Sequence, residues 1–293
     1  MILKNTNMIT DNTHYLKSDE MNENSDIKNC ASDNFLEKNE KHSKMKLKRF
    51  SEEIMNTITY DLIQNQFDLD TFDDNLQNKD IQQDGRILSA MNENKVTEAI
   101  KKIFSKNNYY KNNDLALITP NIDGKNNRAW YDVAIISNSN KELFIPINIK
   151  ISALFNNADN LNCKTGMVYA LTGKTPQELG ISNSYGWKKF GQLFLPYVSK
   201  EETGTDYYFL IVNKNNTKDV FWNSLKHIET FTPNGSNLPF QCNFSKNKEI
   251  INLSHKNSVQ KILSTFNKSL IKDIQPKQDL SALLSDSINN LTN

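Results

Sequence analysis

The chain has 293 residues, of which 37% are hydrophobic and 24% are charged, and its formal net charge at pH 7 is +1. This length suffices for one large domain, but the hydrophobic fraction is low for a chain that packs along its whole length. The near-neutral charge excludes a uniformly basic surface, so contact with nucleic acid would depend on local groups of Lys and Arg. The three cysteines, Cys30, Cys163 and Cys242, are far apart and odd in number, which argues against a disulfide framework or a zinc ribbon.

The amino-terminal part of the chain divides into a polar tail and a helical arm. Residues 1–43 are rich in Asn, Asp, Glu, Ser and Lys, so burial cannot offset the entropy of ordering, and we expect a flexible tail there. We expect residues 44–84 to form a helical arm and a linker. Within them, apolar residues recur near helical spacing over 51–70, and the acidic, Asn-rich residues 70–84 are typical of a connection. The compact domain is expected to begin at Gly85.

The segment Ser89–Phe104 is predicted to be a helix that packs through one face. Val96 and Ile100 have the spacing of a single helical face. Glu93 falls on that same face, whereas Glu98 falls nearly opposite it. An acid on an apolar face can serve a site, or it can be a first-turn acid that the helix dipole favours. The sequence leaves both explanations open.

Two β-strands joined by a turn follow this helix. Residues 130–136 and 144–152 are rich in β-branched residues, and residues 137–141 between them favour turns. The pattern predicts an antiparallel hairpin.

The second strand of the hairpin carries a polar stripe. Side chains alternate between the two faces of a strand, so three isoleucines share one face while Asn148, Lys150 and Ser152 share the other. The hairpin would bring Asp132 of the first strand near Lys150. Because both strands are otherwise apolar, as central strands are, a polar stripe is unusual here. The alternative is a solvated face with an incidental ion pair.

The second half of the chain is predicted to continue with helices and strands. Residues 165–171 and 187–195 are expected to be helices around a Gly-, Pro- and Ser-rich loop. The aromatic stripe Trp187–Tyr197 is more typical of a core than of a base-stacking platform. Residues 206–214 are strongly apolar and predict a central strand beside the hairpin. A further strand, or the turn into a helix, is expected at 220–225.

The carboxyl-terminal part begins with the most turn-dense stretch of the chain. Residues 232–241 contain two prolines and are typical of an ordered loop, for which sequence readout, a dimer contact or a plain surface connection are all open. Helical periods at 259–274 and 280–291 predict two helices that cap the domain or pair two subunits. We therefore expect a compact domain over 85–265 and a helical segment over 266–293.

The hairpin resembles the signature of PD-(D/E)xK nucleases, in which an aspartate on one strand and an acid-x-lysine triplet on the next hold a divalent ion and activate water. Asp132 matches the aspartate and Lys150 the lysine, and the order of helices and strands is similar over Asn92–Lys214. Two positions depart from the signature. Tyr131 stands where the family has a proline that carries no chemistry. Asn148 replaces the acid of the triplet, which removes a charge that Mg²⁺ favours but keeps a carbonyl oxygen.

The resemblance implies an α/β fold with a restriction-endonuclease-like mixed central sheet flanked by helices. Such nucleases often add an acid from the helix beside the first strand, which makes Glu93 our choice for that role and Glu98 the alternative. Mg²⁺ held by Asp132, the Asn148 carbonyl and Glu93 would polarise the phosphate and lower the pKa of bound water. Lys150 would orient that water and offset negative charge. The implied catalytic residues are Asp132, Asn148, Lys150 and Glu93.

Amide side chains beyond the catalytic strand are candidates for contacts with DNA. Asn and Gln can pair with adenine in the major groove, and Lys can hold a phosphate. Because the chain is rich in Asn throughout, an ordinary polar loop is the alternative. The candidates are Asn156, Asn157, Asn160, Asn162, Lys164, Asn234, Asn237 and Gln241.

These expectations combine into a Mg²⁺-dependent type II restriction endonuclease that cuts double-stranded DNA at a short specific sequence. We expect a homodimer, since two sites related by a two-fold axis match the strands of a palindrome, and a separate DNA methyltransferase as partner. The alternatives are an inactive DNA-binding protein of the same fold, which Asn148 favours, and a structure-specific DNA repair nuclease. The sequence has no membrane-spanning run or amino-terminal signal pattern, so a cytoplasmic location is expected.

Overall fold

The computed structural model describes residues 23–70, 85–120, 130–154 and 158–292. The chain divides into two units, residues 1–42 and residues 43–293. In the first unit the described residues belong to helix α1, which runs over Glu23–Asn65. The structure therefore differs from the tail predicted over residues 1–43, because residues 23–43 are helical. That stretch contains no Gly or Pro and several Glu and Lys, which form helices readily.

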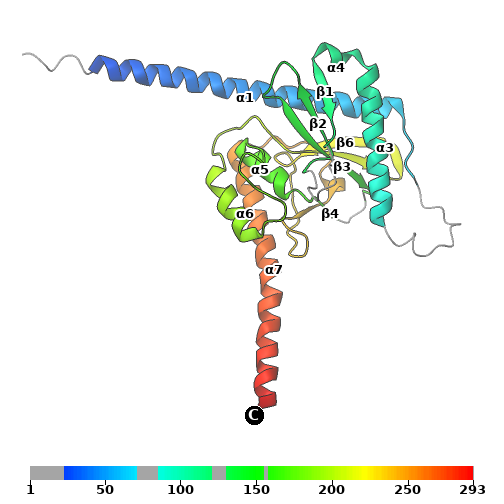
Figure 1. Cartoon of the computed structure of the whole chain (residues 1–293), viewed down its shortest axis with the longest axis vertical. Helices are drawn as coiled ribbons and strands as arrows, with labels where there is room; N and C mark the ends of the chain where they lie inside the picture. Colours follow the sequence, from blue (N-terminus) through cyan, green and yellow to red (C-terminus); the bar gives the residue numbers. More distant parts are fainter. Residues whose placement is uncertain (1–22, 71–84, 121–129, 155–157, 293) are drawn as a thin grey trace, which may run out of the picture. The chain divides into compact units, whose positions relative to one another are not determined.

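A five-stranded mixed sheet lies at the centre of the second unit, with strand order β1-β2-β3-β5-β6. Strands β1, β2 and β3 pair antiparallel, β5 runs parallel to β3, and β6 is antiparallel to β5. The predicted hairpin and the predicted central strand are confirmed as β2, β3 and β5 (Figure 1). The strands are β1 Leu115–Ile118, β2 Val133–Ser137, β3 Phe144–Ser152, β5 Tyr208–Asn213 and β6 Asn216–Ser224.

The register of the hairpin positions the polar stripe. Val133 of β2 lies opposite Ile147 of β3. Asp132, just before β2, hydrogen-bonds to the backbone of Ile147 and Ile149, the two neighbours of Asn148. Asn148 and Lys150 share one face of β3. The prediction that β3 separates its isoleucines from its polar residues is confirmed, since Ile147 and Ile149 are completely buried in the core.

Helices cover both faces of the sheet (Figure 1). On one face, residues of α1 and of α3 (Gly85–Lys106) share a buried cluster with Ile147 and Leu210. On the other face, α5 (Lys164–Thr172), α6 (Trp187–Phe194) and α7 (His255–Thr292) share a second cluster with Phe209. Helix α5 lies between β3 and β5 in the chain and provides the crossover that a parallel pair requires.

The aromatic stripe of α6 is core, as predicted, with one exception. Phe190 and Phe194 are completely buried, and Trp187 packs edge-on against Phe190. Tyr197 lies in the short 3₁₀ helix η1 (Leu195–Tyr197) and is 49% exposed, so its place in the stripe is wrong.

The carboxyl-terminal segment differs from the prediction. Helix α7 is continuous over His255–Thr292, where two helices were expected, and the predicted boundary between residues 265 and 266 falls inside it. The expected break lay around Pro276, a residue that usually weakens a helix interior. The segment predicted at 220–225 as a strand or a turn is the end of strand β6.

The remaining elements are short. They are α4 (Asn108–Asn112), β4 (Asp159–Asn160), β7 (Gln241–Cys242) and η2 (Phe244–Lys246). Strands β4 and β7 form a separate two-stranded antiparallel sheet. Two-residue strands have too few positions to show a periodicity, so the sequence did not predict them. No helix in the described ranges combines the length and the apolar character needed to cross a bilayer.

Candidate active site

Asp132 sits immediately before β2, and strand β3 fixes its position. Its backbone N–H donates to the carbonyl of Ile147 at 2.9 Å, and its Oδ2 accepts a hydrogen bond from the backbone N–H of Ile149 at 2.7 Å. Among the described residues, its second oxygen, Oδ1, has no hydrogen-bond donor. Burial raises the pKa of Asp132, while the hydrogen bond from Ile149 and the charge of Lys150 oppose that shift. The carboxylate is thus held rigidly with one oxygen still available.

Lys150 projects from the same face of β3 as Asn148 and is half-buried. None of the described residues accepts a hydrogen bond from its ammonium group or forms a close ion pair with it. Burial lowers the pKa of Lys150, while the negative charges of Asp132 and Glu93 oppose the shift. Buried lysines are rare without a direct partner, so this ammonium group is suited to a bound anion.

Glu93 lies on helix α3 near Asp132 and Lys150. We call the group of polar side chains around Asp132, Asn148 and Lys150 the recess. Ser89 donates a hydrogen bond to Glu93 Oε1 at 3.2 Å. Burial and the charge of Asp132 raise the pKa of Glu93, and Lys150 opposes that shift, so the three charges are close enough to act on one another. Helix α3 begins at Gly85 and has no acid in its first turn, so the explanation of Glu93 as a first-turn acid is wrong.

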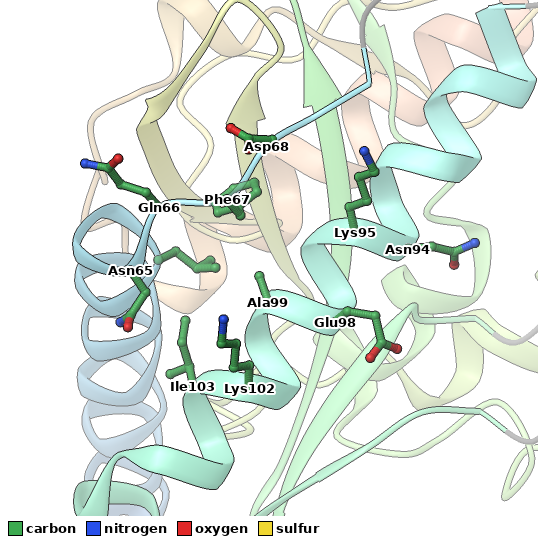
Figure 2. A pocket seen from close by; sticks show the side chains of 11 residues that line it. Asn65, Gln66, Phe67, Asp68, Asn94, Lys95, Glu98, Ala99, Lys102 and Ile103 are labelled. Atoms are coloured by element: carbon green, nitrogen blue, oxygen red, sulfur yellow. The ribbon is translucent and has the colours of Figure 1, made fainter.

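Glu98, the alternative to Glu93, serves a different part of the molecule. It is exposed and pairs with Lys101 at 2.8 Å. It also lines a pocket of about 430 Å³ between the end of α1, the segment after it and α3 (Figure 2). Phe67, Ala99 and Ile103 supply apolar walls there. This pocket includes none of Asp132, Asn148, Lys150 and Glu93, so the structure places Glu93 but not Glu98 beside the recess.

Asn148 occupies the position of the acid that the signature expects. Its amide oxygen Oδ1 is buried and accepts no hydrogen bond from any residue in the described ranges. A buried carbonyl without a donor is unfavourable by about 1–3 kcal/mol. Such an atom in a recess with Asp132 and Lys150 marks a position for a ligand.

Sequence reasoning missed a further carboxylate. Asp159 of β4 accepts a hydrogen bond from Ser152 Oγ at 2.7 Å. Burial raises the pKa of Asp159, while that hydrogen bond and the charge of Lys150 oppose the shift. Asp159 stands in an Asn-rich stretch without periodicity, and the pairing of β4 with distant β7 and the hydrogen bond from Ser152 hold it in place. The only feature of the sequence that could have pointed to Asp159 is its position shortly after β3, the strand that carries the polar stripe.

The recess combines three carboxylates, those of Glu93, Asp132 and Asp159, with the single ammonium of Lys150. When all four groups are ionised, this set is negatively charged and attracts a cation. Yet within the described ranges no three His, Cys, Asp or Glu side chains are grouped tightly enough to hold a metal ion by themselves. An oxygen-binding cation would therefore also need the Asn148 carbonyl or an oxygen of a substrate.

The structure brings four of the predicted DNA-contact residues together on the small sheet. Asn160 lies opposite Gln241 across β4 and β7. Asn160 donates to the amide oxygen of Asn237 at 3.1 Å, and Asn234 donates to that of Gln241 at 2.8 Å. All four are partly exposed, so each keeps some capacity for an external partner.

The other predicted DNA-contact residues are Asn156, Asn157, Asn162 and Lys164. Asn156 and Asn157 lie outside the described residues. Asn162 is exposed beside the small sheet. The ammonium of Lys164 donates to the carbonyl oxygens of Asn183 and Tyr185 and lies 4.6 Å from the centre of the Trp187 ring. Lys164, at the start of α5, is thus hydrogen-bonded to the loop that contains Asn183 and Tyr185.

Comparison of the chain with protein-family models, with curated proteins and with solved structures found no match.

Proposed function

We propose that the protein is a Mg²⁺-dependent endonuclease of the type II restriction kind, which hydrolyses phosphodiester bonds at a short sequence in double-stranded DNA. The observation that carries this proposal is the recess itself. Asp132, Lys150 and Glu93 come from three separate segments, influence one another's pKa, and include a buried ammonium without a direct partner among the described residues. Reacting groups with opposed pKa shifts in one recess are typical of active sites.

The order of elements also supports the proposal. Helix α3 precedes the antiparallel strands β1 to β3, and α5 then leads to β5, which is parallel to β3. This is the order that we expect for a restriction-endonuclease-like core. Asp132 directly precedes β2 and Lys150 lies on the neighbouring strand β3, an arrangement similar to that of the signature.

The oxygen donors of the recess suit Mg²⁺, which prefers carboxylate and carbonyl ligands. Asp132 Oδ1 and the unpaired Oδ1 of Asn148 would hold the ion, with Glu93 as a further ligand. When bound, Mg²⁺ would stabilise charge on the phosphate and make its water more acidic.

The side chains of the recess have separate tasks in this proposal. Lys150 donates hydrogen bonds to the attacking water and to a phosphate oxygen, for which a compact ammonium group is well suited. Asp132 needs no reorganisation because the Ile149 N–H already holds one of its oxygens. Glu93, as a further ligand, would help to position the attacking water on the ion.

The small sheet supports sequence-specific binding. Its partly exposed amides, Asn160, Asn234, Asn237 and Gln241, offer donors and acceptors of the kind that pair with adenine. Ser152, at the end of β3, binds Asp159 at the start of this sheet, so the amides are linked directly to the catalytic strand. We further propose a homodimer on a palindromic site and a separate methyltransferase that protects the host DNA.

The test is incubation of the purified chain with phage DNA and Mg²⁺. Discrete fragments of reproducible length are the expected result, and chelation of the metal should abolish them. Binding of DNA without fragments would instead support the inactive DNA-binding alternative that Asn148 favours. Cuts that follow DNA junctions or lesions rather than a sequence would support a repair nuclease.

A further inference from the structure

The four amides of the small sheet, Asn160, Asn234, Asn237 and Gln241, are joined in two pairs. Asn234 donates to Gln241 Oε1 at 2.8 Å, and Asn160 donates to Asn237 Oδ1 at 3.1 Å. The oxygen of an amide accepts hydrogen bonds and its NH₂ group donates them, so the direction of each pair decides which group is left for an external partner.

Backbone N–H groups fix the orientation of the two donating amides. Asn234 Oδ1 accepts from the backbone N–H of Ser236 at 2.8 Å and from that of Asn237 at 3.1 Å. Asn160 Oδ1 accepts from the backbone N–H of Asn162 at 3.2 Å. A backbone N–H can only donate, so the oxygen of each amide must face it. Neither Asn234 nor Asn160 can turn over without losing these contacts, and their NH₂ groups therefore face the neighbouring amides.

The two receiving amides, Asn237 and Gln241, are oriented in turn. Each presents its oxygen to an NH₂ group of the protein, which leaves its own NH₂ group on the other side of the amide. Among the described residues, neither Asn237 Nδ2 nor Gln241 Nε2 has an acceptor, and neither nitrogen is buried. The small sheet thus offers two NH₂ groups, each with two N–H donors, to an external partner.

We propose that Asn237 and Gln241 recognise guanine in the major groove through these NH₂ groups. This inference rests on the proposed function and narrows the base that the small sheet contacts. Guanine presents two acceptors, N7 and O6, which match the two N–H donors, whereas adenine places the N6 donor beside its N7 acceptor. Pairing with adenine would require an amide oxygen to accept a second hydrogen bond while it holds its partner in the protein. Asn234 and Asn160 are positioning residues, since they hold the two recognition amides by their oxygens.

Selection from random DNA duplexes tests the proposal without cleavage. The purified full chain would be mixed with duplexes that contain a random central segment, with Ca²⁺ in place of Mg²⁺, and the bound duplexes would be amplified and sequenced. We expect an enriched site that contains guanine. Replacing a contacted guanine with 7-deazaguanine, which lacks the N7 acceptor, should weaken binding at least about fivefold. This measurement uses the unaltered chain, so it stands even if a variant does not fold.

Two substitutions change the outward group and keep the internal contacts. Gln241→Glu retains an oxygen for Asn234 and replaces the outward NH₂ group with an acceptor. Asn234→Asp retains the oxygen that faces Ser236 but removes the NH₂ group, so the Gln241 amide turns over and presents its oxygen outward. We expect both variants to lose the guanine at the position that Gln241 contacts and to select a base with a donor there, cytosine or adenine.

Asn162→Asp is the matched control, because it adds the same charge at an exposed residue beside the small sheet. It should weaken binding to all duplexes through repulsion of the phosphates and leave the base preference unchanged. A preference that shifts equally in Asn162→Asp and Gln241→Glu would overturn the proposal. An unchanged preference in both Gln241→Glu and Asn234→Asp would also overturn it.

The outcomes separate this inference from the proposed nuclease. A selected site without guanine, or one in which 7-deazaguanine binds as well as guanine, would overturn the inference while cleavage at that site would still support the nuclease. Selective binding with the expected change of base, by a chain that does not cut DNA with Mg²⁺, would support the inference and reject only the nuclease. Enrichment of no sequence would overturn both the inference and the sequence-specific part of the proposed function.

Discussion

Lys226, which is buried, and Lys150, which is half-buried, have opposite surroundings. Lys226 is 2% exposed and donates to Glu202 at 2.9 Å, to the Thr203 hydroxyl at 3.0 Å and to the carbonyl of Thr205 at 2.7 Å. Its three donors are thus used within the protein. Lys150 has no such partner among the described residues. The first arrangement is a completed structural network, and the second leaves binding capacity for something that the chain does not supply.

The acids beside the two lysines differ in the same way. Burial by itself would raise the pKa of Glu202, but His255, whose Nδ1 lies 3.7 Å from Glu202 Oε1, and the charge of Lys226 together lower it. For Glu93 and Asp159 burial prevails, and their pKa values are raised. The charge of Glu202 is thus compensated within the fold, whereas the charges of Glu93 and Asp159 are compensated less well.

The largest expected effect is a loss of DNA cleavage when Lys150 is replaced. Lys150→Ala should lower the rate of Mg²⁺-dependent cleavage about 1,000-fold, the loss typical of removing one group that stabilises transition-state charge. Its melting temperature should stay the same or rise, because the change removes a buried charge without a direct partner. Cleavage of phage DNA followed over time measures the rate, and Lys101→Ala, which alters an exposed lysine, is the matched control. A Lys150→Ala chain that still cuts at the original rate would end the proposed role.

Replacement of the other lysine, Lys226, is expected to affect the stability of the fold. Lys226→Met should lower the free energy of unfolding by about 3–5 kcal/mol, because it leaves the partly buried Glu202 and the Thr205 carbonyl without their donor. Urea denaturation of Lys226→Met and Lys150→Met, two identical replacements, gives the comparison directly. If Lys150→Met proved the more destabilising of the two, the distinction between a structural and a functional lysine would be wrong.

Local pattern predicted the parts of the site that lie on regular elements. Alternation along β3 placed Asn148 and Lys150 on one face, and helical spacing directed Glu93 inward. These inferences succeeded because the side-chain period of a strand or a helix depends on nearby residues alone.

The parts that the sequence did not reveal depend on contacts between distant segments. Asp159 belongs to β4, which pairs with the distant strand β7, and it also accepts a hydrogen bond from Ser152 of β3. Helix α7 shows a second limit. Helical periods at 259–274 and 280–291 predicted two helices, whereas the structure has one continuous helix. Propensity is a weak guide wherever tertiary packing decides.

A smaller effect is expected from restoring the missing acid. Asn148→Asp should lower the Mg²⁺ concentration for half-maximal cleavage about 10-fold, because a carboxylate is a stronger ligand for a hard cation than an amide carbonyl. Cleavage rates over a series of Mg²⁺ concentrations measure this. Asn138→Asp, a change of the same kind at an exposed residue of the β2–β3 turn, is the control. An unchanged or higher Mg²⁺ requirement for Asn148→Asp would argue that residue 148 is not a ligand.

The smallest effect is a pH-dependent change in stability at Glu93. Folding raises the pKa of this acid, so its ionised form destabilises the folded state above the folded pKa, and that penalty disappears as the pH falls toward the unfolded value of about 4.3. Glu93→Gln should therefore raise the melting temperature by a few degrees at pH 7 and leave it unchanged near pH 4. Glu202→Gln should lower the melting temperature at both pH values, since folding lowers the pKa of Glu202 and its stabilisation is lost only as the pH falls through that lowered folded pKa. Thermal denaturation of both variants at the two pH values measures the signs. Equal signs for the two glutamates would show that the recess is as well compensated as the network around Lys226.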